Sequence, residues 1–164
     1  MVGEGAVLVD GVGDGDIDAA RFQLARVLGP DVEILAAVAG RGWSYLVATD
    51  ATGVLGYAYF TQLRDRSAYR FTAENSIYVR EDVRGQGVGK LLVARLLADA
   101  ETAGFRQMIA VIGDSENIGS IGVHTSLGFK QVGLLRASGL KFGRWVDTVY
   151  MQRALGRGDV DVPG

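Results

Sequence analysis

The chain has 164 residues, of which 48% are hydrophobic and 22% charged, and its formal net charge is −2 at pH 7. This length fits a single domain with its own core, and the composition is ordinary for a globular protein. Because there is no cysteine and only one histidine, His124, the composition excludes disulfides, a cysteine nucleophile, and thiolate or histidine-rich metal sites.

The first part of the chain is predicted to form mainly strands. Apolar runs predict three of them, over 6–9, 44–50 and 54–60. A glycine-containing turn at 52–53 joins the last two strands as a hairpin. A helix is predicted over 18–28, whereas 31–43 fits either a helix or a strand followed by a loop.

The next predicted strand, 69–79, has two faces of different character. Counting by two gives one mainly apolar face, made of Phe71, Ala73, Asn75, Ile77 and Val79. The other face is polar throughout and consists of Thr72, Glu74, Ser76 and Tyr78. We expect the first face to lie in the core and the second to face a cleft or solvent.

Helices and strands alternate in the rest of the chain. An apolar stripe at helical spacing predicts a helix over 88–103 that ends near Gly104, and 117–127 is predicted as a helix ended by Gly128. Three further strands are predicted, over 106–112, 129–136 and 145–152. This order predicts an α/β protein whose mixed sheet has an antiparallel part.

A glycine-rich turn separates the strand 69–79 from the helix 88–103. It consists of Arg84, Gly85, Gln86, Gly87, Val88, Gly89 and Lys90. Glycines allow a ligand to approach the backbone closely, and the free N–H groups at a helix start attract anions, so the turn predicts a pyrophosphate site. It is neither a Walker A loop, since Leu91 follows Lys90, nor a dinucleotide fingerprint, since Lys90 replaces the last glycine. A tight turn without a ligand is the alternative.

The turn has the pattern Arg-x-x-Gly-x-Gly, which is typical of the Gcn5-related N-acetyltransferase (GNAT) superfamily. From about 44 to 155 the chain resembles this superfamily, and particularly its phosphinothricin and methionine sulfoximine acetyltransferase branch. Five stretches in the same order carry the resemblance: FTAENSIYV (71–79), VRGQGVGKLL (83–92), MIAVIG (108–113), ENIGSIGVHTSLGF (116–129) and LRASGLKFGRWVD (135–147). Residues 1–43 depart from the family pattern, because they lack the aromatic-bearing loop that walls the acceptor pocket.

The resemblance implies the GNAT fold, an α/β fold with a mixed, mostly antiparallel sheet flanked by helices. Two central parallel strands, here 69–79 and 106–112, splay apart and admit the pantetheine arm of the cofactor. It implies a single N-acetyltransferase domain over 1–164, with an atypical, shortened part at 1–43 and a flexible tail at 157–164.

Acetyl-CoA is the co-substrate that the resemblance implies. The loop 84–90 would hold its pyrophosphate, and backbone groups would pair with its pantetheine amides at Ile77, Tyr78 and Val79. Asn117 and Ser120 would also contact the cofactor, although Asn117 by itself is equally typical of a helix N-cap.

The proposed chemistry needs a base, because a protonated amine cannot attack a thioester. Glu74 lies on the polar strand face and matches the family's glutamate, so it is the candidate general base, with a solvated carboxylate as the alternative. Backbone N–H groups near Tyr78 or Val79 would meet the oxyanion. The resemblance gives His124 the role of general acid toward the leaving thiolate. Tyr78 competes for that role, and a structural helix histidine is the alternative.

Two further segments match the acceptor side of the family. Arg64, Arg66 and Tyr69 match a pattern that holds the acidic end of an amino-acid-like substrate, and arginine grips such anions in a bidentate way. A solvated loop is the alternative for these residues. A later segment matches a loop of the family, and the resemblance implies that it lines the site or a dimer contact; it contains Lys141, Phe142, Arg144 and Trp145. Phe142 and Trp145 equally suit anchors in the core.

The sequence thus predicts an N-acetyltransferase that acts by direct attack on a small amine such as phosphinothricin or methionine sulfoximine. A non-catalytic acyl-CoA-binding or regulatory module is the alternative, as is an acetyltransferase for a protein or antibiotic amine. The chain has no long basic run, no membrane-length apolar stretch and no signal-peptide pattern. We therefore expect a cytoplasmic protein that binds no metal, nucleic acid or membrane, and the resemblance is compatible with a homodimer.

Overall fold

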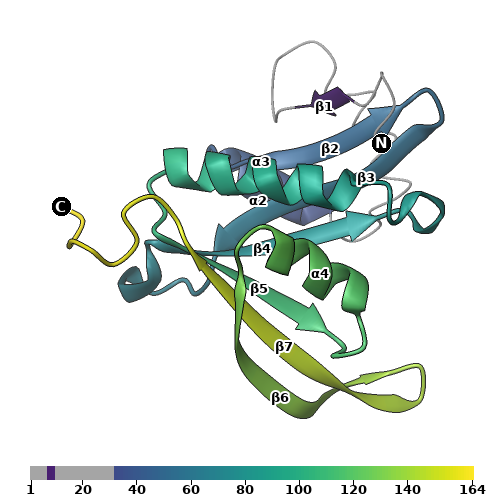
Figure 1. The fold of residues 1–164 in the computed structure, drawn as a ribbon. Helices are drawn as coiled ribbons and strands as arrows, with labels where there is room; N and C mark the ends of the chain where they lie inside the picture. Colours follow the sequence, from purple (N-terminus) through teal and green to yellow (C-terminus); the bar gives the residue numbers. More distant parts are fainter. Residues whose placement is uncertain (1–6, 10–31) are drawn as a thin grey trace.

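The computed structural model describes residues 7–9 and 32–164, which form one seven-stranded sheet with helices against it (Figure 1). The strands are β1 (Val7–Val9), β2 (Tyr45–Asp50), β3 (Gly53–Gln62), β4 (Thr72–Val79), β5 (Gln107–Gly113), β6 (Lys130–Lys141) and β7 (Arg144–Ala154). The helices are α2 (Val32–Gly40), α3 (Val88–Thr102) and α4 (Ile118–Ser126). Single 3₁₀ turns at Ser67–Tyr69 and Glu81–Val83 flank β4.

The strands follow the order β1-β2-β3-β4-β5-β7-β6 across the sheet. Every neighbouring pair is antiparallel except β4 and β5, which are parallel. The prediction of a mixed, mostly antiparallel sheet with two parallel central strands is therefore confirmed. The resemblance implied that these two strands are central, and they do lie in the middle of the sheet.

The main core lies between the sheet and the helices α3 and α4. Its buried side chains include Phe60, Leu92, Leu96, Met108 and Met151. β3 is buried over six consecutive positions because its two faces are both covered, which explains its continuous apolar sequence. The apolar stripe predicted for α3 thus faces the sheet, except that Leu91 is 36% exposed.

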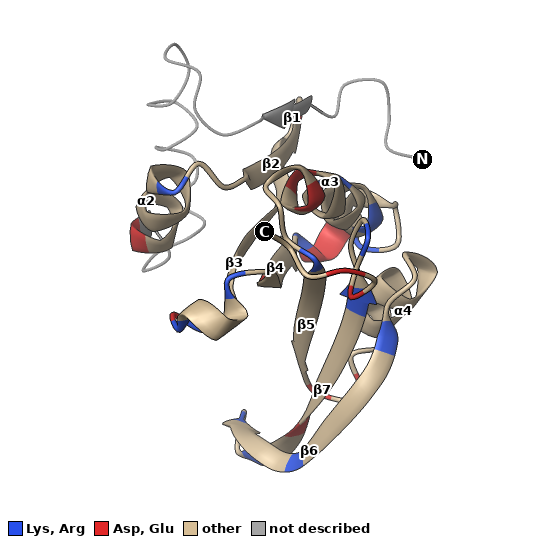
Figure 2. Cartoon of the chain, turned by 90° about the vertical axis from the view of Figure 1, so that its left-hand side faces the viewer, with Lys and Arg blue, Asp and Glu red and all other residues tan. Residues whose placement is uncertain are grey.

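The opposite face of the sheet carries a smaller core beneath α2 (Figure 2). Val38 of α2 packs there with tyrosines of β2 and β3. The rings of Tyr45 and Tyr59 stack with their centroids 5.2 Å apart, and those of Tyr45 and Tyr57 with theirs 5.8 Å apart. The ambiguous segment 31–43 is therefore mostly helical, because its apolar side serves this second core. The helix predicted over 18–28 lies outside the described residues.

The strand predicted over 69–79 begins later than expected, at Thr72. Arg70 has right-handed helical dihedrals, φ −60° and ψ −17°, so the chain is still turning just before the strand. The side-chain amide of Gln62 donates hydrogen bonds to the carbonyls of Arg64 and Arg66, which holds this turn in place. The predicted strand start at 69 is therefore wrong.

The strand predicted over 129–136 is too short, because β6 continues to Lys141. The β6–β7 hairpin closes at Phe142 and Gly143, whose φ values are both positive, at 51° and 72°. The register shifts near Ala137, a residue with φ 47°, and the Asp147 carboxylate accepts a hydrogen bond from its N–H. Local patterns in the sequence do not reveal this irregularity.

Candidate active site

The parallel strands β4 and β5 diverge part-way along their length. Their pairing runs from Thr72–Gln107 to Asn75–Ala110 and ends there. β4 continues to Val79 on β3, and β5 continues to Gly113 on β7. The divergent stretch therefore comprises 76–79 of β4 and 111–113 of β5, which agrees with the predicted splay.

The backbone groups of β4 alternate between its two neighbours. The Arg80 N–H donates to the Leu55 carbonyl, and the Thr72 carbonyl accepts from Leu63, so even-numbered residues are directed toward β3. The odd-numbered residues Ile77 and Val79 consequently direct their N–H and C=O groups toward the divergence. The backbone N–H and C=O of Tyr78 are directed toward β3. Among the three residues predicted to pair with the pantetheine amides, Tyr78 is therefore the one whose backbone does not face the divergence.

The glycine-rich turn lies directly after the divergent part of β4. Gly85 and Gly87 have φ values of 78° and 91°, a backbone region that residues with a side chain rarely adopt. Gly87 is the N-cap residue of α3 and forms no side-chain capping hydrogen bond. The N–H groups of the first helical turn therefore face outward at an exposed site, where the helix dipole favours anions. A Cβ on Gly89 would lie 3.5 to 3.6 Å from side-chain carbons of Val79, Ile77 and Val123, so the turn packs closely on β4 and α4.

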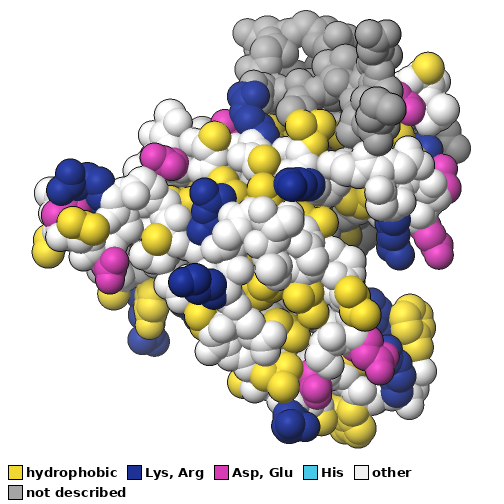
Figure 3. Space-filling view, in the orientation of Figure 1, with side chains coloured by type: hydrophobic (Ala, Val, Ile, Leu, Met, Phe, Trp, Pro, Cys, Tyr) yellow, Lys and Arg dark blue, Asp and Glu magenta, His cyan; other side chains and the backbone are white. Residues whose placement is uncertain are grey.

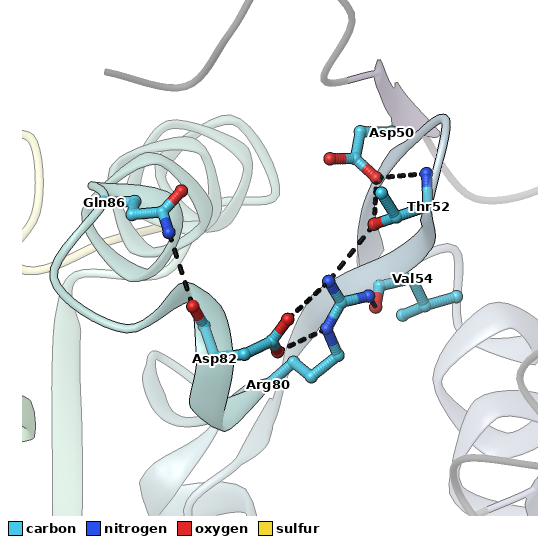
Figure 4. Close-up of polar contacts among 6 residues, drawn as sticks. All are labelled: Asp50, Thr52, Val54, Arg80, Asp82 and Gln86. Atoms are coloured by element: carbon cyan, nitrogen blue, oxygen red, sulfur yellow. Dashed lines mark hydrogen bonds and ion pairs between the residues drawn. The ribbon is translucent and has the colours of Figure 1, made fainter.

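Arg80 ties the 3₁₀ turn at Glu81–Val83, just before the glycine-rich turn, to the distant β2–β3 hairpin (Figure 4), and the Gln86 side chain of the glycine-rich turn donates to the Asp82 carbonyl at 3.4 Å. The Arg80 guanidinium donates to the Asp82 carboxylate at 2.6 and 3.0 Å, to the Val54 carbonyl at 3.0 Å and to the Thr52 hydroxyl at 3.1 Å. Asp50 in turn accepts hydrogen bonds from the backbone N–H and the hydroxyl of Thr52. Sequence reasoning missed this cluster because Val54 and Thr52 lie 26 and 28 residues from Arg80 along the chain.

Glu74 lies on the face of β4 that is directed toward α2. It stands opposite Thr61 of β3, and the next residues on this face, Ser76 and Tyr78, stand opposite Tyr59 and Tyr57 of the smaller core. Burial raises the pKa of the half-buried Glu74 carboxyl above its usual value, and the positive charge of Arg64 opposes this shift. A carboxylate with a raised pKa is a better proton acceptor near neutral pH.

His124 reaches β4 from the other face of the sheet. It is 1% exposed, and its Nε2 lies 3.0 Å from the amide nitrogen of Asn75, which is 5% exposed. Its Nδ1 lies 2.8 Å from the carbonyl oxygen of Ser120. Burial lowers the pKa of His124, and the hydrogen bond to Ser120 opposes that shift. Sequence reasoning missed Asn75, whose signal is an amide on an otherwise apolar strand face.

The candidate base and the candidate acid therefore approach β4 from opposite sides. Glu74 and Asn75 are neighbours in a strand, so their side chains point to opposite faces, and Asn75 contacts His124. The two predicted catalytic groups can meet only through the divergence between β4 and β5. Tyr78, the competing acid, lies on the Glu74 face, is 49% exposed and stacks on Tyr57 at 4.7 Å.

The predicted acceptor residues lie in the loop between β3 and β4. Arg64, Arg66 and Tyr69 are all exposed there, next to the 3₁₀ turn at Ser67–Tyr69. Arg64 lies close enough to Glu74 to lower its pKa, so this loop and the carboxylate share one side of the sheet. The structure thus brings part of the predicted acceptor set to the predicted base.

Asn117 and Ser120 form the start of α4. The Asn117 side-chain oxygen accepts a hydrogen bond from the Ser120 N–H at 3.2 Å, so the N-cap interpretation of Asn117 is confirmed. The Ser120 carbonyl of this first turn faces Nδ1 of His124, which lies one turn further along the helix. The start of α4 therefore orients the imidazole, and it also provides a hydrogen-bond partner for one of the free N–H groups of the helix.

The end of the β6–β7 hairpin carries exposed apolar and basic side chains (Figure 3). Phe142 is 92% exposed and Trp145 is 65% exposed, so the interpretation of these rings as core anchors is wrong. They stand at a hairpin tip that projects from the sheet, where no second layer covers them. Arg144 forms an ion pair with Asp114, which links this tip to the loop after β5.

Two kinds of feature are absent from residues 7–9 and 32–164. No group of three or more histidine, aspartate or glutamate side chains there could hold a metal ion. In the same ranges, no helix combines the length and the apolar character that crossing a membrane requires.

Comparison with known proteins gives consistent matches. A family model described as the acetyltransferase (GNAT) family matches residues 22–129. The phosphinothricin N-acetyltransferase of Alcaligenes faecalis is 52% identical over 128 residues, which are 78% of this chain and 65% of that protein. The L-methionine sulfoximine/L-methionine sulfone acetyltransferase of Pseudomonas paraeruginosa is 45% identical over 115 residues, or 70% of this chain and 66% of that protein. The chain thus spans just under two thirds of the length of these curated relatives.

Solved structures share the same architecture. A GNAT superfamily phosphinothricin acetyltransferase from Sinorhizobium meliloti, in complex with acetyl-CoA, superposes with a TM-score of 0.83 and 38% identity. The match covers 98% of this chain and 94% of that one.

Proposed function

Because the chain belongs to the acetyltransferase (GNAT) family, we propose that it transfers the acetyl group of acetyl-CoA to the amine of a small amino-acid-like substrate. Phosphinothricin and methionine sulfoximine are the first acceptors to test, since relatives at 52% and 45% identity carry those names. A cytoplasmic location belongs to the same proposal, because acetyl-CoA is used inside cells.

The divergence of β4 and β5 is the observation that carries this proposal. A long, thin thioester arm needs backbone partners, and the N–H and C=O groups of Ile77 and Val79 are directed into the divergent stretch. The glycine-rich turn that follows offers free N–H groups to a pyrophosphate. Asn117 and Ser120 are at the start of α4, which follows the divergent end of β5 along the chain.

Glu74 is the proposed general base. The half-buried carboxylate takes the proton of the acceptor amine, directly or through water, and the freed lone pair attacks the thioester carbon. Of the backbone groups considered for the oxyanion, the Val79 N–H is directed toward the divergence, whereas the Tyr78 N–H is directed to β3. Collapse then breaks the carbon–sulfur bond, and His124 or Tyr78 protonates the leaving thiolate.

Arg64, Arg66 and Tyr69 are the proposed acceptor-binding residues. The carboxylate of an amino acid, or the phosphinate of phosphinothricin, suits the planar guanidinium of arginine. Arg64 supports this role best, because its charge acts on Glu74 and its loop therefore lies on the side of the base.

A homodimer formed through β6 also belongs to the proposal. β6 is the last strand of the sheet, so one of its edges is open, and its side chains Val132, Leu134, Leu135 and Leu140 are exposed. A second copy would cover these apolar residues. Leu135→Lys should convert a dimer to a monomer in analytical ultracentrifugation, whereas Val160→Lys, an exposed apolar position in the C-terminal segment, should not. A monomeric parent protein would refute this part of the proposal.

Thiol release from acetyl-CoA, measured against a panel of amines, tests the activity. We expect release that depends on phosphinothricin, methionine sulfoximine or a related amino acid. Release only with a peptide or antibiotic amine would move the substrate class. Binding of CoA in calorimetry without release to any amine would favour the regulatory-module alternative, and no binding of CoA would overturn the proposal.

Two variants test the role of Glu74. Glu74→Gln should lower kcat by about 10²-fold with little change in the affinity for CoA, because a positioned base contributes on that scale. Glu101→Gln, at an exposed position on α3, is the matched control and should behave like the parent protein. The parent kcat/KM should fall as pH drops through the raised pKa of Glu74, and a Glu74→Gln variant with the same pH profile would refute the assignment.

A further inference from the structure

A buried polar pair lies at the point where β4 and β5 begin to diverge. Asn75, paired with Ala110, is the last residue of β4 that pairs with β5, and its side chain contacts His124 of α4. Within 33–164, Asn75 and His124 are the two buried polar residues. The imidazole also packs edge-on against Phe129, with the ring centroids 4.9 Å apart.

The contacts of the imidazole determine where its proton lies. The Ser120 carbonyl oxygen can only accept a hydrogen bond, so Nδ1, 2.8 Å away, carries a hydrogen. Burial lowers the pKa of His124, which keeps the ring neutral, so Nε2 carries none. Nε2 then accepts a hydrogen bond from the Asn75 amide N–H at 3.0 Å. The two causes of the pKa shift are burial and the Ser120 carbonyl, and neither is a charged side chain.

We propose that Asn75 is a positioning residue, which holds His124 as the neutral Nδ1–H tautomer with Nε2 as a proton acceptor at the start of the β4–β5 divergence. Neither the motifs nor the relatives assign whether this histidine donates or accepts a proton at Nε2. In the resting protein Nε2 has no proton to give, and the N–H of Nδ1 is engaged by a backbone carbonyl.

This inference deepens the proposed acetyl transfer, and its kinetic part rests on it. The attacking amine loses one proton when the nitrogen–carbon bond forms, and the thiolate gains one proton when the carbon–sulfur bond breaks. His124 can take part in that exchange only by accepting a proton at Nε2 first, while the Asn75 amide turns so that its oxygen accepts the new N–H. The imidazole thus stores the proton between the two events.

The single histidine makes the tautomer directly measurable. Because His124 is the only histidine in the chain, ¹⁵N-histidine labelling gives one imidazole to observe, without assignment. Long-range ¹H–¹⁵N spectra of the full chain at neutral pH should show a protonated Nδ1 and an unprotonated Nε2. A protonated Nε2 would overturn the proposal, and this measurement needs neither acetyl-CoA nor an acceptor.

Asn75→Asp tests the positioning role. A carboxylate in place of the amide accepts from Nε2–H, so the ring should become doubly protonated at neutral pH. Gln131→Glu makes the same change of charge at an exposed position on β6 and should leave the imidazole signals as they are. An unaltered imidazole in a folded Asn75→Asp protein would overturn the proposal. If this variant does not fold, the spectrum of the parent protein still decides the tautomer.

Kinetics complete the test. Asn75→Asp should lower kcat about tenfold or more, on the scale of a disturbed acid–base group, with an unchanged KM for acetyl-CoA. An unchanged kcat alongside a doubly protonated ring would overturn the kinetic part alone. If the parent protein releases no thiol with any amine, the proposed activity fails, whereas the tautomer measurement still stands.

Discussion

The two faces of the sheet around β4 are built differently. On the side of α3 and α4, Ala73 and Asn75 are buried, and Ile77 and Val79 pack against the main core. On the side of α2, Glu74 and Ser76 are half-buried and Tyr78 is exposed. One strand thus presents a side buried in the main core and a side that is partly open to solvent. Apart from the Asn75–His124 pair, we expect changes on the first side to alter stability and cofactor affinity, and changes on the second to alter turnover and acceptor affinity.

The strongest way to test this contrast is to remove a buried side chain from α3. Leu92 is fully buried beneath the site, whereas its neighbour Leu91 is exposed. Leu92→Ala should cost about 2–5 kcal/mol of unfolding free energy through lost burial and a cavity. Leu91→Ala should stay within about 0.5 kcal/mol, as a surface change does. Urea unfolding measures both, and equal losses would contradict the contrast.

A smaller but more local effect is expected at Gly56 of β3. A Cβ there would lie 2.6 Å from the Tyr78 carbonyl oxygen and 3.2 Å from the Val79 Cα, so β3 and β4 would have to separate. Gly56→Ala should cost about 1–3 kcal/mol through overpacking, and it should weaken CoA binding because Val79 moves. Gly40→Ala, where a Cβ meets nothing within 4 Å, is the control for calorimetry and unfolding. Unimpaired CoA binding by a destabilised Gly56→Ala protein would separate the two effects and count against the role of Val79.

Arg80 tests the contacts at the end of β4, beyond its two faces. Arg80→Ala releases the tie between the β2–β3 hairpin and the 3₁₀ turn that precedes the glycine-rich turn (Figure 4). We expect the KM for acetyl-CoA to rise roughly two- to fivefold with kcat unchanged, since exposed ion pairs contribute modestly. Arg157→Ala breaks a comparable pair with Asp161 in the C-terminal segment and should leave KM unchanged. A fall in kcat with an unchanged KM for acetyl-CoA would contradict this role of Arg80 in cofactor binding.

The smallest expected effect concerns the stability cost of Glu74. Its raised pKa means that the native state holds this proton more tightly than the unfolded state, so stability falls as pH rises through the native pKa. Glu74→Gln removes that loss. Its Tm should match that of the parent below about pH 4, where both states are protonated. Above the native pKa it should exceed the parent by no more than about 2 °C. A lower Tm for Glu74→Gln across this range would contradict the cause assigned to the shift.

Much of this architecture could be predicted because its signals are local. The alternation over 71–79 identified the two faces of β4, and the spacing of leucines in 88–103 identified the buried side of α3. The glycines at 85 and 87 could be recognised because only a residue without a side chain easily adopts their positive φ. Such patterns need no knowledge of the partner element.

The features that escaped prediction depend on contacts between distant residues. The Asn75–His124 pair joins residues 49 positions apart, and nothing near either residue identifies its partner. In the sequence, nothing distinguishes Arg80 from the other charged residues near it. Its contacts with Thr52 and Val54 arise only when the β2–β3 hairpin forms beside it. The extension of β6 rests on the Asp147 carboxylate, which accepts from the irregular backbone at Ala137 ten residues away.

The placement of Glu74 and His124 on opposite faces makes the sheet a partition between two compartments. In the proposed reaction, the amine and the nucleotide occupy different sides and meet only through the opening after Asn75. Neither has to leave before the other enters, so initial-rate plots for the two substrates should intersect. Free CoA should then compete with acetyl-CoA but not with the amine. The geometry of β4 and β5 therefore determines how the binding of acetyl-CoA and the amine and the release of products are ordered.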